Sequence, residues 1–318
     1  MSDHSHSGSP ELQALAPVRT PIIGIIGGKG RMGRWFHRFF EEQGFHVIIS
    51  DIGTRLSPED VAVAANVVIL SLPMNVFPEV VEQVGPLVPR EHLLTDFCSL
   101  KQTQVECMLE HSSCEVIGTH PLFGPGEPGI EGHRVAICPA RGERWLPWWK
   151  RLFQLAGAAT PIFTPQEHDR TMAWVQALNH FVLLCLGKSL EEDGIDFRHV
   201  IELATPSFAR QLDILARLCF QDPELYAFIQ MANPYTDAAL ETFDKYARQL
   251  RSIVAGKDRP GFVKMFKEVQ ELGPMILELK EEAERQKAAS VERAARSRSD
   301  GPPGGCAGCG GGPCKTDS

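Results

Sequence analysis

The sequence predicts an α/β protein with a doubly wound, mainly parallel, Rossmann-like sheet followed by an all-α helical domain. Up to about residue 165, short apolar runs alternate with helix-like segments, a pattern typical of parallel strands covered by helices on both faces. From residue 166 onward the strand signal disappears. Apolar residues there recur three or four positions apart, as on amphipathic helices.

Seven apolar runs are predicted to be strands. They cover residues 22–26, 46–50, 66–72, 93–96, 115–120, 134–138 and 160–163. The sequence Ser57-Pro58-Glu59-Asp60 predicts a helix start between the second and third strands, because a hydroxyl cap precedes proline and acidic residues. In the second half, helices are expected over residues 166–192, 198–220, 222–232, 235–256 and 259–290.

A glycine-rich turn follows the first predicted strand and opens the helical segment after it. It consists of Gly28, Lys29, Gly30, Arg31, Met32 and Gly33. We expect Gly28 to permit the tight turn, Gly30 to let the backbone approach a pyrophosphate, and Gly33 to let the helix pack on the strand. Free amides at the helix start would hold phosphates. The turn therefore predicts a dinucleotide site, and a glycine-rich turn without a ligand is the alternative.

Asp51 ends the second predicted strand, where such domains place the acid that accepts hydrogen bonds from ribose hydroxyls. This favours NAD over NADP, although Arg55 lies close enough in sequence to meet a 2′-phosphate. A surface role for Asp51 is the remaining alternative. We also assign Ser71 and Pro73, at the end of the third predicted strand, to the cofactor site.

Polar residues follow the fourth and fifth predicted strands, at the sheet edge where open α/β domains bind ligands. His120 is the candidate base for oxidation of a carbinol, since a histidine titrates near neutrality. Ser99 could hydrogen-bond to its imidazole, and Lys101 could attract an acidic substrate. Taken alone, a histidine such as His120 would more readily be interpreted as structural. Its position and neighbours favour catalysis.

The composition excludes several classes of protein. A formal net charge of −8 and the lack of a basic face argue against nucleic-acid binding. We find neither an uninterrupted apolar stretch of about 18 residues nor a basic and then apolar leader, so we expect a cytoplasmic protein without membrane contact. Six scattered cysteines are expected to be free thiols. They are Cys98, Cys107, Cys114, Cys138, Cys185 and Cys219.

Six sequence blocks resemble, in order, the signature blocks of the prephenate dehydrogenase family, which acts in tyrosine biosynthesis. The blocks are GGKGRMG, LSLP, DFCSLKQ, GTHPLFGP, EHDRTMAWVQALNHF and ARLCFQDPELYAFI. The match runs from about residue 21 to about residue 270. Each block is weakly specific, but the ordered set is strongly specific.

The resemblance implies roles for residues of both domains. His120 would bond the ring hydroxyl of the substrate, with Ser99 as its partner. Arg217 would pair with a substrate carboxylate, for which a guanidinium is well shaped, and His180 would line the same pocket. We assign Gln176, from the same block as His180, to substrate binding as well. Without the family, Arg217 would be read as a surface cation on an amphipathic helix.

The implied reaction is the NAD-dependent oxidative decarboxylation of prephenate to 4-hydroxyphenylpyruvate. Dehydrogenases of arogenate or of 4-amino-4-deoxyprephenate are the near alternatives. A non-catalytic dinucleotide sensor is a more distant one, because it would need neither Ser99 nor His120. Too few residues precede Pro21 for the mutase domain of the enteric members, so we expect a monofunctional enzyme. Asn179 replaces an arginine of those members, which bears on substrate preference and tyrosine feedback.

These expectations divide the chain into four parts. They are a disordered tail over 1–20, a dinucleotide-binding domain over 21–165, a helical substrate-binding and dimerisation domain over 166–290, and a disordered Gly/Cys-rich tail over 291–318. The polar end of the helical domain should continue a helix into solvent. Its long helices offer apolar faces for a homodimer.

The last tail contains Cys306, Cys309 and Cys314. With His4 or His6 these thiols could hold a soft metal, but one C-x-x-C pair is a weak signal. Solvent-exposed disorder is the favoured interpretation, and we predict no metal.

Overall fold

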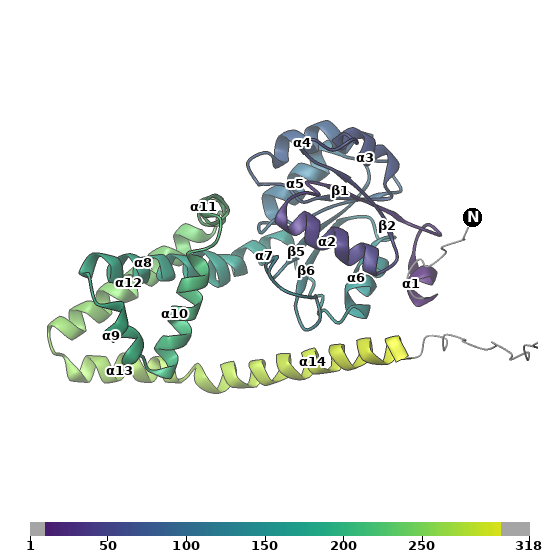
Figure 1. Cartoon of the computed structure of the whole chain (residues 1–318). Helices are drawn as coiled ribbons and strands as arrows, with labels where there is room; N and C mark the ends of the chain where they lie inside the picture. Colours follow the sequence, from purple (N-terminus) through teal and green to yellow (C-terminus); the bar gives the residue numbers. More distant parts are fainter. Residues whose placement is uncertain (1–9, 300–318) are drawn as a thin grey trace, which may run out of the picture.

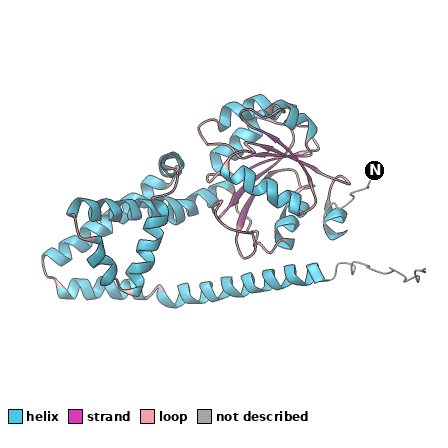
Figure 2. Cartoon of the chain, viewed as in Figure 1, coloured by secondary structure: helices cyan, strands magenta, loops and turns pink. Residues whose placement is uncertain are grey.

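The computed structural model describes residues 10–299. A sheet-containing part extends to about residue 163 and an all-helical part follows it, as Figures 1 and 2 show. The predicted fold class is confirmed. The cysteine-rich segment and His4 and His6 lie outside the described residues.

The sheet has six strands in the order β2-β1-β3-β4-β5-β6. Their bounds are β1 (Ile22–Ile26), β2 (His46–Ser50), β3 (Val67–Leu70), β4 (Leu93–Asp96), β5 (Glu115–Pro121) and β6 (Val135–Arg141). The first five strands pair in parallel, and β6 is antiparallel to β5. The carboxyl ends of β1, β3, β4 and β5 therefore meet at one edge of the sheet.

The predicted strand over 160–163 is wrong. This segment forms a single isolated bridge with β6, between Ile137 and Ile162. Pro161 lacks an N–H and cannot extend the ladder, so only its carbonyl takes part, accepting the N–H of Ile137 at 3.0 Å. Thr164 then caps the next helix directly, which leaves no length for a strand.

Helices cover both faces of the sheet, as the continuous apolar strands predict. They are α2 (Arg31–Glu42), α3 (Pro58–Ala64), α4 (Phe77–Val84), the 3₁₀ turn η1 (Gly85–Leu87), α5 (Gln102–His111) and α6 (Leu146–Leu155). An apolar core lies on each face of the sheet, and alternate side chains of β3 enter different cores. Val67 and Ile69 belong to one apolar cluster, and Val68 and Leu70 belong to the other. The predicted start of α3 is confirmed, with Ser57 and Asp60 forming a reciprocal capping box.

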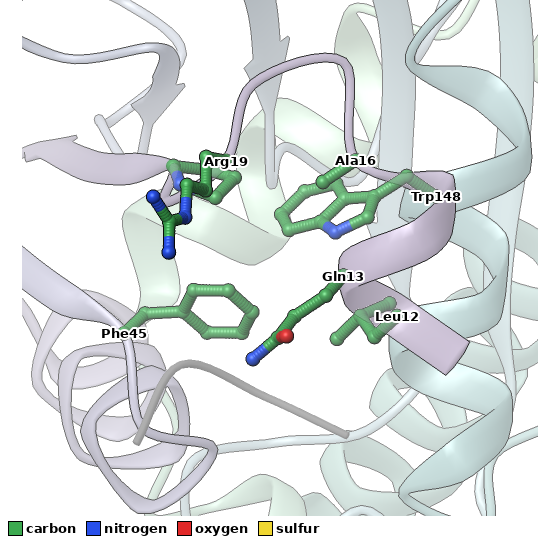
Figure 3. Close-up of a pocket in the computed structure, with 7 residues that line it drawn as sticks. Leu12, Gln13, Ala16, Arg19, Phe45 and Trp148 are labelled. Carbon is green, nitrogen blue, oxygen red and sulfur yellow. The ribbon is translucent and has the colours of Figure 1, made fainter. Parts of the chain in front are cut away.

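The N-terminal tail is shorter than predicted, since residues within 1–20 form helix α1 (Pro10–Leu15). Leu12 is buried, and the Glu11 carboxylate accepts two hydrogen bonds from Arg151 at 2.7 and 2.8 Å. Packing against α6 thus orders a segment whose composition alone suggested disorder. The small hollow beneath α1 is lined by Leu12, Gln13, Ala16, Arg19, Phe45 and Trp148 (Figure 3).

The second half is helical throughout, as predicted, but three predicted helices are each divided. The elements are α7 (Pro165–Met172), the π-helix η2 (Ala173–Leu178), α8 (Asn179–Asp193), α9 (Phe197–Glu202), α10 (Pro206–Leu218), α11 (Pro223–Met231), α12 (Thr236–Ala255), α13 (Arg259–Gln270) and α14 (Gly273–Ser299). In the segment from Pro10 to Ser299, no helix has both the length and the apolarity needed to cross a bilayer.

Helix α14 runs back along the sheet-containing part, next to α6 (Figure 1). It reaches Ser299, so the assignment of 291–318 to a disordered tail is wrong for 291–299. The Lys287 side chain lies against Gly132, where an added Cβ would come within 2.8 Å of the Lys287 Cε. The continued helix predicted from composition is confirmed, but part of it packs on the protein instead of projecting into solvent.

Candidate active site

The glycine-rich turn connects β1 to α2, as predicted, but the positive φ falls on Gly27 and not on Gly28. Gly27 has φ 88°, and the N–H groups of both glycines donate to the Ser50 carbonyl, at 2.8 and 3.2 Å. Gly28 is needed for a different reason. A Cβ there would lie 2.6 Å from the Ile49 Cβ on β2, so glycine lets the turn sit against this strand.

Gly33 and Gly30 have the environments that a dinucleotide turn requires. A Cβ on Gly33 would lie 2.2 Å from the Gly27 carbonyl oxygen, so the close packing of α2 on the turn is confirmed. Gly30 is the N-cap of α2 and provides no side-chain cap. The first-turn N–H groups of α2, including those of Arg31 and Met32, therefore lack intrahelical partners and can donate to a phosphate. These residues fit a dinucleotide.

Ser71 and Pro73 follow β3 beside the turn. Strand order places β2 and β3 on opposite sides of β1, which makes this the topological switch point where α/β domains bind ligands. The Ser71 N–H donates to Ile26 at 2.8 Å, and its carbonyl faces Gly27. Pro73 is exposed.

Asp51 lies against the turn, one residue past β2. Its Oδ2 accepts the backbone N–H of Lys29 at 2.7 Å and its Oδ1 accepts that of Ile52 at 2.7 Å. The Lys29 ammonium donates to the Ile52 carbonyl at 3.0 Å. The half-buried carboxylate is thus fixed beside Gly28 and Gly30, at the place expected for a ribose-binding acid.

His120 lies near the end of β5, at the same edge of the sheet, and is only 3% exposed. Its Nδ1 is 2.9 Å from Nε2 of His168, and Nδ1 of His168 is 2.7 Å from the Asp169 Oδ1. Burial, and then the charges of His168 and Lys101, hold the pKa of His120 well below its ordinary value. His120 is therefore neutral near pH 7 and able to accept a proton.

His168 and Asp169 were not indicated by any sequence pattern as site residues, although both belong to the block EHDRTMAWVQALNHF. The available signal was an adjacent His-Asp pair at the start of the first helix after the sheet. The hydrogen bond predicted between Ser99 and His120 is not formed among the described residues, where the hydrogen-bond partner of His120 Nδ1 is His168. Ser99 is half-buried and lies three residues past the end of β4.

Lys101 does not face a substrate, and its predicted role is wrong. Its side chain is fully buried, its ammonium forms an ion pair with Asp96, and it donates to the Thr119 carbonyl at 3.0 Å. A buried ammonium needs such partners to offset its desolvation. Lys101 instead acts on His120 through its charge, which lowers the pKa of the imidazole.

The helical part contributes Gln176 and His180, one turn apart across the junction of η2 and α8. The Gln176 Oε1 and the His180 Nδ1 are buried, and neither atom has a hydrogen-bond partner among residues 10–299. Unpartnered buried polar atoms are costly, so both atoms are available to a polar ligand. The π-helical turn fits this, since such turns are frequent at functional sites. The His180 ring lies 4.3 Å from that of Tyr226, a residue the sequence analysis did not single out.

Arg217, in the last turn of α10, is exposed. Burial raises the pKa of the Tyr226 phenol, and the positive charges of Arg217 and Arg31 oppose this shift. Both guanidiniums therefore lie within electrostatic reach of Tyr226. Arg217, and Arg31 from the first turn of α2, thus act electrostatically on Tyr226, whose ring contacts that of His180.

Comparison with protein families identifies both parts of the chain. The model described as "Prephenate dehydrogenase, nucleotide-binding domain" matches residues 50–161. The model described as "Prephenate dehydrogenase, dimerization domain" matches residues 164–268. Residues 50–161 thus belong to a nucleotide-binding domain.

Comparisons with individual proteins point to the same family. The chain is 34% identical to a "Probable arogenate/prephenate dehydrogenase" of Methanocaldococcus jannaschii, over 77% of this chain and 59% of that protein. It is 30% identical to the "T-protein" of Enterobacter agglomerans, over 81% and 69% respectively. The chain thus spans about three-fifths to two-thirds of the length of these relatives. The crystal structure of Aquifex aeolicus prephenate dehydrogenase with hydroxyphenyl propionate and NAD+ has the same fold, with a TM-score of 0.65, 22% identity, and coverage of 82% of this chain and 99% of that one. The chain belongs to the prephenate dehydrogenase family.

Proposed function

We propose that this protein is an NAD-dependent dehydrogenase that converts prephenate to 4-hydroxyphenylpyruvate in tyrosine biosynthesis. The observation that carries the proposal is a neutral, buried His120 at the sheet edge that also bears the glycine-rich turn. Family membership supports the reaction class. The Aquifex aeolicus neighbour, in complex with NAD+ and a hydroxyphenyl compound, supports the ligand classes.

The cofactor is assigned to the turn and the residues around it. The N–H groups at the start of α2 would bind the pyrophosphate, and Asp51 would accept hydrogen bonds from the ribose hydroxyls. A carboxylate at this place repels a 2′-phosphate, which favours NAD over NADP. When bound, NAD accepts a hydride. Ser71 and Pro73 border the site on the β3 side.

His120 would move the proton. As hydride leaves the ring carbon that carries the hydroxyl, Nε2 of His120 accepts the hydroxyl proton. The ring carboxylate then leaves as carbon dioxide, and its bonding electrons make the ring aromatic. The oxygen recovers its proton from His120, so the histidine ends the cycle neutral. Base catalysis of this kind contributes about 10²-fold to 10⁴-fold in rate.

The helical part would bind the acidic substrate. A guanidinium pairs with a carboxylate through two parallel hydrogen bonds, a role we assign to Arg217. Gln176 and His180 would satisfy their unpartnered Oε1 and Nδ1 on other polar groups of the substrate. Ser99 is assigned to the reacting hydroxyl, since it follows β4 at the edge where β5 ends.

Substrate choice is tested by following NADH formation by the purified protein with prephenate, arogenate and 4-amino-4-deoxyprephenate. We expect the highest kcat/KM with prephenate and NAD. A higher value with either amino compound would overturn the substrate assignment, and a preference for NADP would overturn the role of Asp51. Binding of NAD without turnover of any of the three would instead indicate a non-catalytic dinucleotide sensor.

Residue roles are tested by two variants with a matched control. His120→Asn should lower kcat by about 10²-fold or more and leave NAD affinity unchanged. Arg217→Ala should raise KM by about 10-fold or more, because a charged partner of the carboxylate is lost. Arg210→Ala, two turns away on α10 and also exposed, should change neither constant. Wild-type constants in His120→Asn or Arg217→Ala would remove that residue from its role.

We also infer a homodimer formed through the helical part. The family's dimerisation model matches residues 164–268, and this region exposes large apolar side chains. Phe220 and Met231 are 86% and 85% exposed. Apolar surface of this extent is typical of an interface between chains.

A further inference from the structure

His168 and Asp169, on α7, are almost fully buried beside the proposed base. We infer that they are positioning residues which fix the tautomer of His120, leaving the lone pair of its Nε2 free for the substrate proton. The inference rests on the proposed role of His120. It assigns a function to two residues that touch neither substrate nor cofactor in the proposed reaction.

The chain of hydrogen bonds begins at the Asp169 carboxylate. Its Oδ1 accepts the backbone N–H of Lys101 and its Oδ2 that of Gln102, each at 2.8 Å. Both donors lie at the start of α5, where the helix dipole favours a negative charge. The Asp169 carbonyl also accepts the Asn233 side-chain amide at 2.8 Å. The carboxylate is therefore held in place as an acceptor.

This acceptor determines the proton positions on both rings. An Asp169 oxygen 2.7 Å from Nδ1 of His168 requires a proton on that nitrogen. Burial keeps the pKa of His168 below its ordinary value, although Asp169 opposes the shift. A neutral His168 with its proton on Nδ1 has a lone pair on Nε2, so Nδ1 of His120 must donate to it. A neutral His120 protonated at Nδ1 then has its lone pair on Nε2.

The same chain stabilises the imidazolium formed during the reaction. When His120 accepts a proton, its Nδ1–H donates a charge-assisted hydrogen bond to His168, which the Asp169 carboxylate supports in turn. The other charged groups nearby are Lys101 and Asp96, which form an ion pair. The Cys138 thiol stays neutral, because burial raises its pKa to about 12. Loss of His168 should therefore affect kcat rather than binding.

Three variants of the full chain test this. His168→Leu removes the acceptor and should lower kcat about 10-fold to 100-fold, with KM and NAD affinity unchanged, because misorientation of a catalytic group costs this much. His168→Gln has an amide oxygen that can accept from Nδ1 of His120, so it should recover most of the loss. His92→Leu is the control. His92 is half-buried, but it precedes β4, at the edge of the sheet opposite the site, and it is bonded to Asn66. It should keep wild-type kcat.

Nitrogen-15 NMR of histidine-labelled protein gives a readout independent of turnover. We expect His120 of the wild-type protein to be protonated at Nδ1 near pH 7, and His168→Leu to lose this preference. Protonation of His120 at Nε2 in the wild-type protein would overturn the inference, even if His168→Leu failed to fold. So would wild-type kcat in a folded His168→Leu. By contrast, full activity of His120→Asn would refute the proposed base itself, so the two failures are distinguishable.

Discussion

The sheet-containing part and the helical part differ in how they bury apolar side chains. In the first, the strands and the facing helices form two continuous cores, with Trp145, Trp148 and Trp149 fully buried. In the second, few of the described apolar residues are buried. They are Met172, Ala173, Ala177, Leu183, Leu215, Ile229 and Ala239.

This difference shows that the two parts are stabilised in different ways. The sheet-containing part buries most of its large apolar side chains within one chain, and this burial stabilises it. The helical part leaves its apolar faces exposed, as expected of helices that need a second chain to cover them. The proposed catalytic groups lie on the self-sufficient part, and most of the proposed substrate-binding groups lie on the other.

A matched pair of tryptophans should show the largest difference. Trp149 is fully buried, its indole N–H donates to the Thr119 hydroxyl at 2.9 Å, and its replacement by alanine should cost about 3–5 kcal/mol. Trp174, on η2, is 49% exposed, and Trp174→Ala should cost far less. Denaturant unfolding of both variants measures this. Equal losses would break the comparison.

Overpacking of the turn should have the next largest effect, confined to the sheet-containing part. Gly33→Ala places a methyl group 2.2 Å from the Gly27 carbonyl oxygen, so α2 must move. We expect a loss of about 1–3 kcal/mol in stability, together with weaker NAD binding by calorimetry. Gly129→Ala is the control, since no described atom lies within 4 Å of the added Cβ. Unchanged NAD affinity in Gly33→Ala would contradict the assigned site.

Stability should depend on pH through the buried histidines. The pKa values of His120, His168 and His180 are lowered, so below about pH 6.5 the unfolded chain binds protons that the folded chain does not. The contribution of these histidines to the free energy of unfolding is therefore fully present above this pH. It falls as the pH decreases, by at most about 1.4 kcal/mol per pH unit for each histidine. Thermal unfolding between pH 7.5 and 5.0 measures the decline. A Tm that rises on acidification would contradict it.

The smallest effect on the single chain is expected at the exposed apolar faces. Phe266, on α13, is 56% exposed, so Phe266→Glu should change the stability of an isolated chain by about 0.5 kcal/mol or less while weakening the proposed dimer. Val63→Glu, at a similarly exposed apolar site on α3, should leave association unchanged. Analytical ultracentrifugation compares the two. An unaltered dimer in Phe266→Glu would exclude this face from the interface.

Features determined by local sequence could be predicted. The bounds of β1, β2 and β4 follow from apolar runs, and the capping box of Ser57 from four consecutive residues. The position of His120 at the functional edge follows from the end of a strand. The antiparallel direction of β6 did not emerge, because it depends on pairing with a distant strand and not on the residues of β6 themselves.

The partners of the site residues could not be predicted for the same reason. The hydrogen bond between His120 and His168 joins residues 48 positions apart, and no periodicity reports such a contact. Lys101 was expected at a surface because lysine is rarely buried, and only the tertiary structure reveals Asp96 as its partner. The predicted pocket residues Gln176 and His180 remain predictions, supported by their unpartnered atoms.

The anchoring of Asp169 constrains how the two parts can move. Its carboxylate binds the N–H groups of Lys101 and Gln102 on the sheet-containing part, although α7 falls within the residues matched to the dimerisation model. Rotation about the boundary near residue 163 would break both bonds and disorient His120. Helix α7, and with it the orientation of the proposed base, is therefore coupled to the sheet-containing part, although the chain places this helix after the last strand.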